Sequence, residues 1–221
     1  MKPTMEFEAE MLVRGPVVGI DEVGRGALAG PLMVGAVVVD CIRAAPRGLA
    51  DSKALTTIQR ERLVPFIEEW ARDVAVGVAT AEEIDAWGLR MALAVATDRA
   101  LSALSVCPSG ALIDGPLNLL RPPSILSFGD EAPTLAWSAL PVLTIVKGDQ
   151  RAATISAAAI LAKVRRDALM RELHGEAPIY GWRANKGYGS LEHRRALAEH
   201  GPTRWHRQSW SLPEIGAEIA R

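Results

Sequence analysis

The sequence predicts a mixed α/β fold in which helices flank a five-stranded sheet and a helical segment closes the chain. Two runs rich in β-branched residues come first, at 17–21 and 31–39. Further strand-like runs then alternate with stretches of helical periodicity, a pattern typical of α/β proteins. Hydrophobic residues make up 49% of the 221 residues and charged residues 23%, as in ordinary globular proteins. We expect a single domain over 1–221, with a core at about 17–173 and a C-terminal segment at 174–221.

The strands are expected where β-branched residues cluster or alternate between glycines, namely at Val17–Asp21, Pro31–Val39, Asp73–Thr80, Ala111–Asp114 and Val142–Val146. Apolar residues at helical spacing predict helices at Thr57–Arg72, Ala81–Ala86, Leu89–Leu104, Arg151–Leu173 and Ser190–His200. Five prolines between Pro116 and Pro141 exclude a continuous element there and indicate a long surface excursion. The last thirty residues are expected to be irregular and to wrap the core or a substrate cleft.

Nothing in the sequence points to a membrane. The uncharged run Gly26–Val39 is too short to cross a bilayer and contains Pro31. The first residues carry Glu6, Glu8 and Glu10 and so do not resemble a signal peptide. We therefore expect a cytoplasmic protein without a membrane partner. The two cysteines, Cys41 and Cys107, lack metal-ligand spacing and are expected to be buried free thiols.

Charge is unevenly distributed along the chain. The formal net charge is −1, which by itself does not indicate a nucleic-acid partner. Residues 151–221 hold 12 Lys and Arg against 7 Asp and Glu, a net charge of +5, whereas residues 1–150 carry −6. Cations and carboxylates thus concentrate in different parts of the chain. Solvent-exposed faces of opposite charge explain this uneven distribution equally well, unless local motifs indicate a functional site.

The first candidate site residues are the neighbours Asp21 and Glu22 at the end of a predicted strand. Side chains alternate faces along a regular strand, so a turn at Gly24 and Gly26 is expected to bring both acids to one space. That turn would also expose backbone N–H groups beside Arg25, which suit a phosphate or a sugar edge. Taken alone, a solvated turn explains the same residues.

Two further acids follow predicted strands. Asp114 ends the strand at 111–114, although Asp-Gly is also a common turn pair. Asp149 precedes the alanine-rich helix, where an N-cap role explains it equally well. Because the carboxyl ends of strands converge at one edge of an α/β sheet, the four acids are expected to meet.

Four neighbouring carboxylates need cations, and ligands that are all oxygen favour Mg²⁺ or Mn²⁺ over zinc. Paired metals about 3.5–4 Å apart suit phosphodiester hydrolysis without a side-chain nucleophile. The sequence contains no GxSxG motif and no Walker A motif, which argues against an α/β-hydrolase and against a P-loop NTPase.

Five linked motifs between about residues 17 and 210 resemble the ribonuclease HII family. The first is Gly19-Ile20-Asp21-Glu22-Val23-Gly24-Arg25-Gly26 followed by Leu28-Ala29-Gly30-Pro31. The others, in order, are Asp51-Ser52-Lys53-Ala54-Leu55-Thr56, Ile113-Asp114-Gly115, Lys147-Gly148-Asp149 with Ala157–Val164, and Lys186-Gly187-Tyr188-Gly189 with His193 and Trp205-His206-Arg207.

The resemblance implies a ribonuclease H-like fold and a metal-dependent endoribonuclease. Such an enzyme would cut the RNA strand of RNA–DNA hybrids and ribonucleotides embedded in duplex DNA, leaving 3′-hydroxyl and 5′-phosphate ends. By resemblance, the metal-binding and catalytic carboxylates, for two Mg²⁺ or Mn²⁺ ions, would be Asp21, Glu22, Asp114 and Asp149. The substrate-binding residues would be Gly24, Arg25 and Gly26 at the 2′-OH, Tyr188 on the following deoxyribose, and Lys53 and Lys186 on phosphates.

The sequence departs from the family pattern at several positions. Family members often carry Lys where Arg151 stands, Ser at Ala152 and Ala159, Lys at Ala54 and His at Asn185. These departures put substrate affinity in doubt more than the chemistry. We expect a monomer, and binding to a sliding clamp stays open. The alternatives are another nuclease of the same superfamily, such as a junction resolvase, which would not need Gly24-Arg25-Gly26 with Tyr188, or a hybrid-binding protein without catalysis, which would gain nothing from four acids facing phosphates.

Overall fold

A five-stranded mixed sheet forms the centre of the molecule in the computed structural model, which describes residues 2–121 and 133–219. The strand order is β3-β2-β1-β4-β5. The three N-terminal strands pair antiparallel, whereas β4 pairs parallel with both β1 and β5. The observed bounds are β1 Val17–Val23, β2 Leu32–Val39, β3 Asp73–Ala79, β4 Gly110–Asp114 and β5 Val142–Ile145. All five predicted strands are confirmed.

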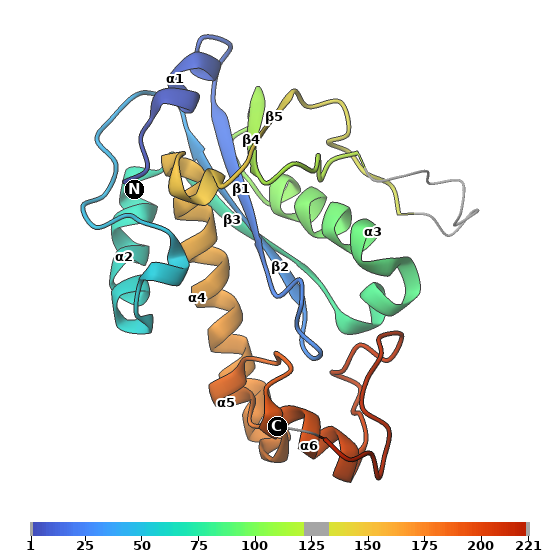
Figure 1. Ribbon diagram of the computed structural model, residues 1–221. Helices are drawn as coiled ribbons and strands as arrows, with labels where there is room; N and C mark the ends of the chain where they lie inside the picture. The colour runs from blue at the N-terminus through green and yellow to red at the C-terminus, as the bar shows by residue number, and fades with distance from the viewer. Residues whose placement is uncertain (1, 122–132, 220–221) are drawn as a thin grey trace.

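Three long helices cover the sheet. On one face lies α3 (Ala81–Ser102), and on the other lie α2 (Thr57–Trp70) and α4 (Ala153–Glu176) (Figure 1). The C-terminal elements gather at the far end of α4 (Figure 1). The shorter helices are α1 Glu6–Leu12, α5 Trp182–Asn185 and α6 Leu191–His200, with 3-10 turns η1 Ser52–Ala54, η4 Gly148–Gln150 and η5 Pro178–Tyr180.

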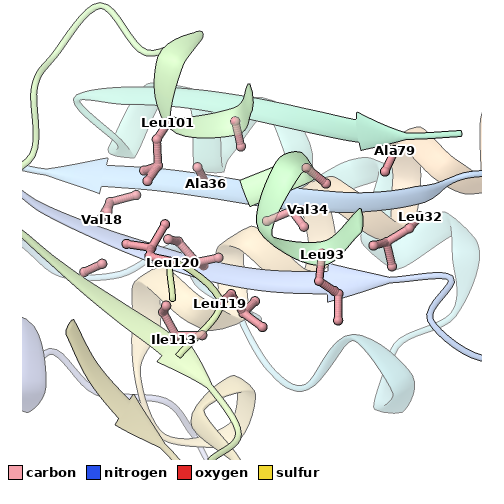
Figure 2. Packing of buried hydrophobic residues seen from close by; sticks show 14 of the residues in the cluster. Val18, Leu32, Val34, Ala36, Ala79, Leu93, Leu101, Ile113, Leu119 and Leu120 are labelled. Carbon is pink, nitrogen blue, oxygen red and sulfur yellow. The ribbon is translucent and has the colours of Figure 1, made fainter. Parts of the chain in front are cut away.

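Strand β2 shows why two hydrophobic layers form. Every residue of β2 is buried, and its side chains alternate between the two faces as the pleat requires. Leu32, Val34, Ala36 and Val38 pack with α3 in the cluster drawn in Figure 2, whereas Val37 and Val39 pack with α2 and α4. Helix α4 comes so close that a Cβ at Gly35 would overlap the backbone of Ala158. The alanine-rich sequence of α4 permits this approach.

The helix predictions are confirmed within a few residues, with one instructive detail. The predicted gap between two helices at 87–88 corresponds to Gly88, whose φ of +73° kinks α3 between its short first part and its long second part. The short helices α1 and α5 were not predicted. The prediction of an irregular C-terminal stretch is confirmed only in part: residues 192–200 of the last thirty belong to α6, whereas residues 201–219 contain no helix and only a single β-bridge, from Ala29 to His206.

The cysteine prediction is wrong in one respect. Cys41 and Cys107 are free thiols as expected, but both are exposed. Each lies in a connection just after a buried element ends, where the chain returns to the surface. The predicted excursion at 116–141 falls partly outside the described residues, since 122–132 are not among them. Within the described ranges, no helix is both long enough and apolar enough to cross a membrane.

Candidate active site

The predicted carboxylates gather where β1 and β4 part. The parallel pairing of these strands ends at Ile20 and Ile113, and an acid follows each residue directly. Strand β1 nevertheless stays paired with β2 through Val23. The turn expected to redirect Glu22 therefore begins only after it. Because β1 has lost its β4 neighbour beyond Ile20, its open edge lets both Asp21 and Glu22 reach the same cleft.

Asp114 joins the end of β4 to the turn that carries Asp149. Its Oδ1 accepts hydrogen bonds from the Gly148 amide at 2.6 Å and from the Asp149 amide at 3.4 Å. Asp149 lies in the 3-10 turn η4, whereas the N-cap of α4 is Ala152. The N-cap explanation of Asp149 is therefore excluded. Parallel pairing of β4 with β5 aligns Asp114 with Ile145, the last residue of β5, four residues before Asp149.

A cleft of about 350 Å³ collects most of the predicted site residues. It contains three of the four acids, the whole Gly24–Gly26 turn, Lys53 and Tyr188. Its other lining residues are Val23, Ser52, Ala159 and Lys163. Asp149 and Lys186 are not among these residues. Asp149 is 6% exposed and lies behind Lys53, whose Nζ is 3.9 Å from its Oδ2.

The carboxylates carry negative charge that the protein compensates poorly. Burial, followed by the charges of Glu22, Asp114 and Asp149, raises the pKa of Asp21 well above its usual value. Burial also raises the pKa of Glu22, against the opposing effect of Arg25, whose guanidinium lies 3.5 Å away. Burial and the neighbouring Asp114 raise the pKa of Asp149. Asp21, Glu22 and Asp149 would each keep their charge more readily beside a cation.

These acids offer only oxygen donors, which are the ligands that Mg²⁺ and Mn²⁺ prefer. Over residues 2–121 and 133–219, no group of three or more His, Cys, Asp or Glu side chains has an arrangement that could hold a metal ion as it stands. All four carboxylates instead contact protein cations or amides. The donor chemistry and the poorly compensated charge fit a divalent cation, although the side chains do not form a closed cage.

The Gly24–Gly26 turn has a backbone that requires glycine at its start. Gly24 has a φ of +86°, and a Cβ there would overlap the side chain of Arg166. Tyr188 follows α5 on the other side of the cleft and is 37% exposed. Its ring lies 5.4 Å from the Arg166 guanidinium, and its carbonyl is 2.9 Å from His193 Nδ1. The turn and the tyrosine therefore rest on a common buried support.

The two predicted phosphate-binding lysines differ in position. Lys53 is in η1 with 84% of its side chain exposed, at the rim of the cleft. Lys186 caps the end of α5 with a φ of +52°, and its ammonium donates to the carbonyl of Arg183. Burial lowers the pKa of Lys186. Lys186 thus lies beside Gly187–Gly189, the tyrosine loop that carries Tyr188.

Some lining residues were missed, although the sequence contained a signal for two of them. Ala159 and Lys163 are four residues apart on α4 and so share one helix face. Both belong to the 157–164 motif, of which no residue was assigned a role. Lys163 is oriented by Asp167, whose Oδ1 lies 2.5 Å from its Nζ. Asp167 also pairs with Arg60 at 3.8 Å.

Three of the five departures from the family pattern correspond to specific contacts in the structure. Ala152 cannot cap α4 with its side chain, but Glu8 of α1 accepts from the Thr154 amide instead, at 2.8 Å. Asn185 accepts from the Gly187 amide and donates to the Tyr180 carbonyl, which orders the loop before Tyr188. Arg151 lies over the Phe7 ring, 4.9 Å from its centroid.

Comparison with known proteins identifies the family of the chain. The family model described as Ribonuclease HII matches residues 18–212. A ribonuclease HII of Jannaschia sp. is 44% identical over 206 residues, which cover 93% of this chain and 94% of that protein. The ribonuclease H2 of Pyrococcus horikoshii has a similar structure, with a TM-score of 0.67 and 26% identity over 89% of this chain and 94% of that one. Ribonuclease HII of Archaeoglobus fulgidus, in a complex with PCNA, gives a TM-score of 0.64 and 25% identity over 88% and 93% of the two chains. The chain therefore belongs to the ribonuclease HII family, and it is a ribonuclease H that cleaves RNA in RNA–DNA hybrids.

Proposed function

We propose that the enzyme hydrolyses phosphodiesters at ribonucleotides, both in RNA–DNA hybrids and where they are embedded in duplex DNA. One observation carries this proposal: acidic residues and the Gly24–Gly26 turn, with backbone N–H groups that suit a sugar hydroxyl, line the same cleft. A junction resolvase would need the first group but not the second. Four acids facing phosphates would only weaken a protein that binds without catalysis.

The residues proposed to hold two Mg²⁺ or Mn²⁺ ions are Asp21, Glu22, Asp114 and Asp149. When bound, such paired ions supply an activated water and stabilise the leaving oxygen, giving 3′-hydroxyl and 5′-phosphate ends. The protein's own contribution is placement. Strands β1 and β4 fix Asp21 and Asp114, and the amide of Gly148 orients the Asp114 carboxylate. Lys53 at the rim would bind a substrate phosphate, as would Lys186 beside the tyrosine loop.

Discrimination of RNA from DNA requires a separate group of contacts. Metal ions bind phosphates, which are the same in both polymers, whereas the 2′-OH exists only in RNA. We assign its recognition to the backbone of Gly24, Arg25 and Gly26. Tyr188 would pack on the deoxyribose that follows, where a 2′-OH is absent. A site built to pair a hydroxyl strongly rejects the analogue that lacks it.

A cleavage assay tests the reaction. The substrates are an RNA–DNA hybrid, a DNA duplex with one ribonucleotide and the matching all-DNA duplex, with Mg²⁺ and Mn²⁺ compared. We expect cleavage of the first two only, and a loss of about two orders of magnitude or more in turnover for Asp114→Asn. Asp40→Asn, an exposed acid outside the cleft, is the control. Full activity of Asp114→Asn, or equal cleavage of all-DNA duplex, would exclude the proposal.

Substitution of Tyr188 tests the substrate assignment. Tyr188→Phe keeps the ring, whereas Tyr188→Ala removes the packing surface and the contact with Arg166. Tyr188→Ala should therefore lose much more activity on a single embedded ribonucleotide than Tyr188→Phe does. Thermal melting of both variants shows whether they fold. If Tyr188→Ala does not fold, or if it cleaves the duplex with one embedded ribonucleotide as well as the wild type does, then Tyr188 is only a structural residue.

We propose a monomer with a single domain, a cytoplasmic location, and roles in DNA replication and ribonucleotide excision repair. The Archaeoglobus fulgidus relative was solved with PCNA. For this chain, sliding-clamp binding stays an open expectation.

A further inference from the structure

Arg207 is a fully buried arginine whose guanidinium contacts carbonyls rather than a carboxylate. Its side chain is 0% exposed. One terminal nitrogen donates to the Arg25 carbonyl at 2.8 Å, and the other donates to the carbonyls of Gly24 at 2.6 Å and Gly30 at 3.3 Å. In the described part of the chain it has no ion pair. Burial lowers the pKa of Arg207 to about 10, so it remains charged at neutral pH.

These contacts, together with the hydrogen bond from the Ala27 amide to the Gly24 carbonyl at 3.2 Å, fix the direction of two peptide groups in the Gly24–Gly26 turn. In a planar trans peptide the carbonyl and the following N–H point in opposite directions. Because the Gly24 and Arg25 carbonyls face the buried guanidinium, the N–H groups of Arg25 and Gly26 face away from it. Both residues line the cleft. Among the hydrogen bonds of residues 2–121 and 133–219, neither N–H has a protein acceptor.

The same C-terminal segment ties this turn to the tyrosine loop. The Arg207 amide donates to the Leu28 carbonyl at 2.9 Å. The amides of Leu28 and Ala29 in turn donate to the carbonyl of Gly187, at 2.8 and 3.1 Å. Gly187 immediately precedes Tyr188. These hydrogen bonds, which link Arg207 to Leu28 and then to Gly187, therefore set the distance across the cleft between the Gly24–Gly26 turn and the Tyr188 ring.

We propose that Arg207 is a positioning residue for ribonucleotide recognition, which holds the Arg25 and Gly26 amides toward the 2′-OH of the substrate. This inference rests on the proposed role of the Gly24–Gly26 turn. The planar guanidinium binds several carbonyls at once, whereas a lysine ammonium is a compact point charge on a flexible stem. A lysine at this position keeps the charge but releases the fixed geometry of the two peptides.

The test measures binding without hydrolysis. Fluorescence anisotropy in Ca²⁺ gives the Kd for a DNA duplex with one ribonucleotide and for the matching all-DNA duplex. The ratio of the two values reports discrimination. For Arg207→Lys we expect the ratio to fall about tenfold, as loss of hydrogen bonding to the hydroxyl implies, with little change in affinity for the all-DNA duplex. Amide hydrogen exchange should also become faster in the peptide that contains residues 24–26.

Leu197→Ala is the matched control. Leu197 is fully buried in the hydrophobic cluster that also contains Tyr180 and Trp182. Its truncation therefore destabilises the same region of the protein without touching the Gly24–Gly26 turn. We expect it to lower the melting temperature but to preserve the binding ratio. The proposal is overturned if Arg207→Lys keeps the wild-type ratio, or if Leu197→Ala lowers the ratio equally. Failure of the proposed function is distinct, because the wild-type protein itself would then show no preference for the ribonucleotide duplex.

Discussion

At the scale of single residues, the site is defined by acids that are costly to bury. Asp21 shows this most clearly, because burial and three neighbouring carboxylates together raise its pKa. A folded protein that holds such a group charged loses stability relative to the unfolded chain. The acid is therefore retained for function at the expense of the metal-free fold.

Asp21→Asn should stabilise the metal-free enzyme while abolishing turnover. An acid whose pKa is raised by folding costs nothing below its unfolded pKa of about 3.9, and its cost grows as pH rises toward the folded pKa. In EDTA, the melting temperature of Asp21→Asn should therefore exceed that of the wild type near pH 7, and the difference should vanish near pH 4. The exposed-acid variant Asp40→Asn serves as control. A lower melting temperature for Asp21→Asn at pH 7 would contradict this account.

At the scale of elements, the start of α4 shows what sequence patterns do not reveal. The alanine-rich run predicted the helix, and Asp149 was a reasonable candidate for its cap. The cap instead comes from α1, where Glu8 Oε1 accepts from both the amide and the hydroxyl of Thr154, each at 2.8 Å. Glu8 is fully buried. A contact across 146 positions leaves no periodic signal, so it could not be predicted.

Glu8→Ala should lower the free energy of unfolding by about 1–2 kcal/mol, the usual cost of losing an N-cap. Glu8→Gln should lose less, because the amide oxygen can still accept from Thr154. Urea unfolding curves for the three proteins measure the difference. Glu10→Ala is an exposed control on the same helix. If Glu8→Ala were as stable as the wild type, the cap from α1 would be unimportant.

At the scale of the whole molecule, two different parts of the fold hold the residues that line the cleft. The acids are fixed by strands β1 and β4, whose positions follow from runs of β-branched residues and could be predicted. The Gly24–Gly26 turn is held by Arg207 of the irregular C-terminal segment, and Arg166 of α4 binds the carbonyls of Ala29 and Pro31 just after it. Strand and helix patterns gave neither arginine a role, because the carbonyls of Pro31 and Gly24 that they bind are more than 130 positions away. The last family motif contains Arg207, but the resemblance assigned it no role.

The central claim is that Asp21, Glu22, Asp114 and Asp149 form one metal site. Anomalous diffraction from crystals soaked in Mn²⁺ tests it most directly, with crystals of Asp114→Asn as the matched control. We expect Mn²⁺ peaks between these carboxylates, and when substrate is bound we expect two peaks about 3.5–4 Å apart. The peaks should be weaker in crystals of Asp114→Asn. Peaks located elsewhere, or peaks unchanged by Asp114→Asn, would show that these carboxylates do not form the metal site.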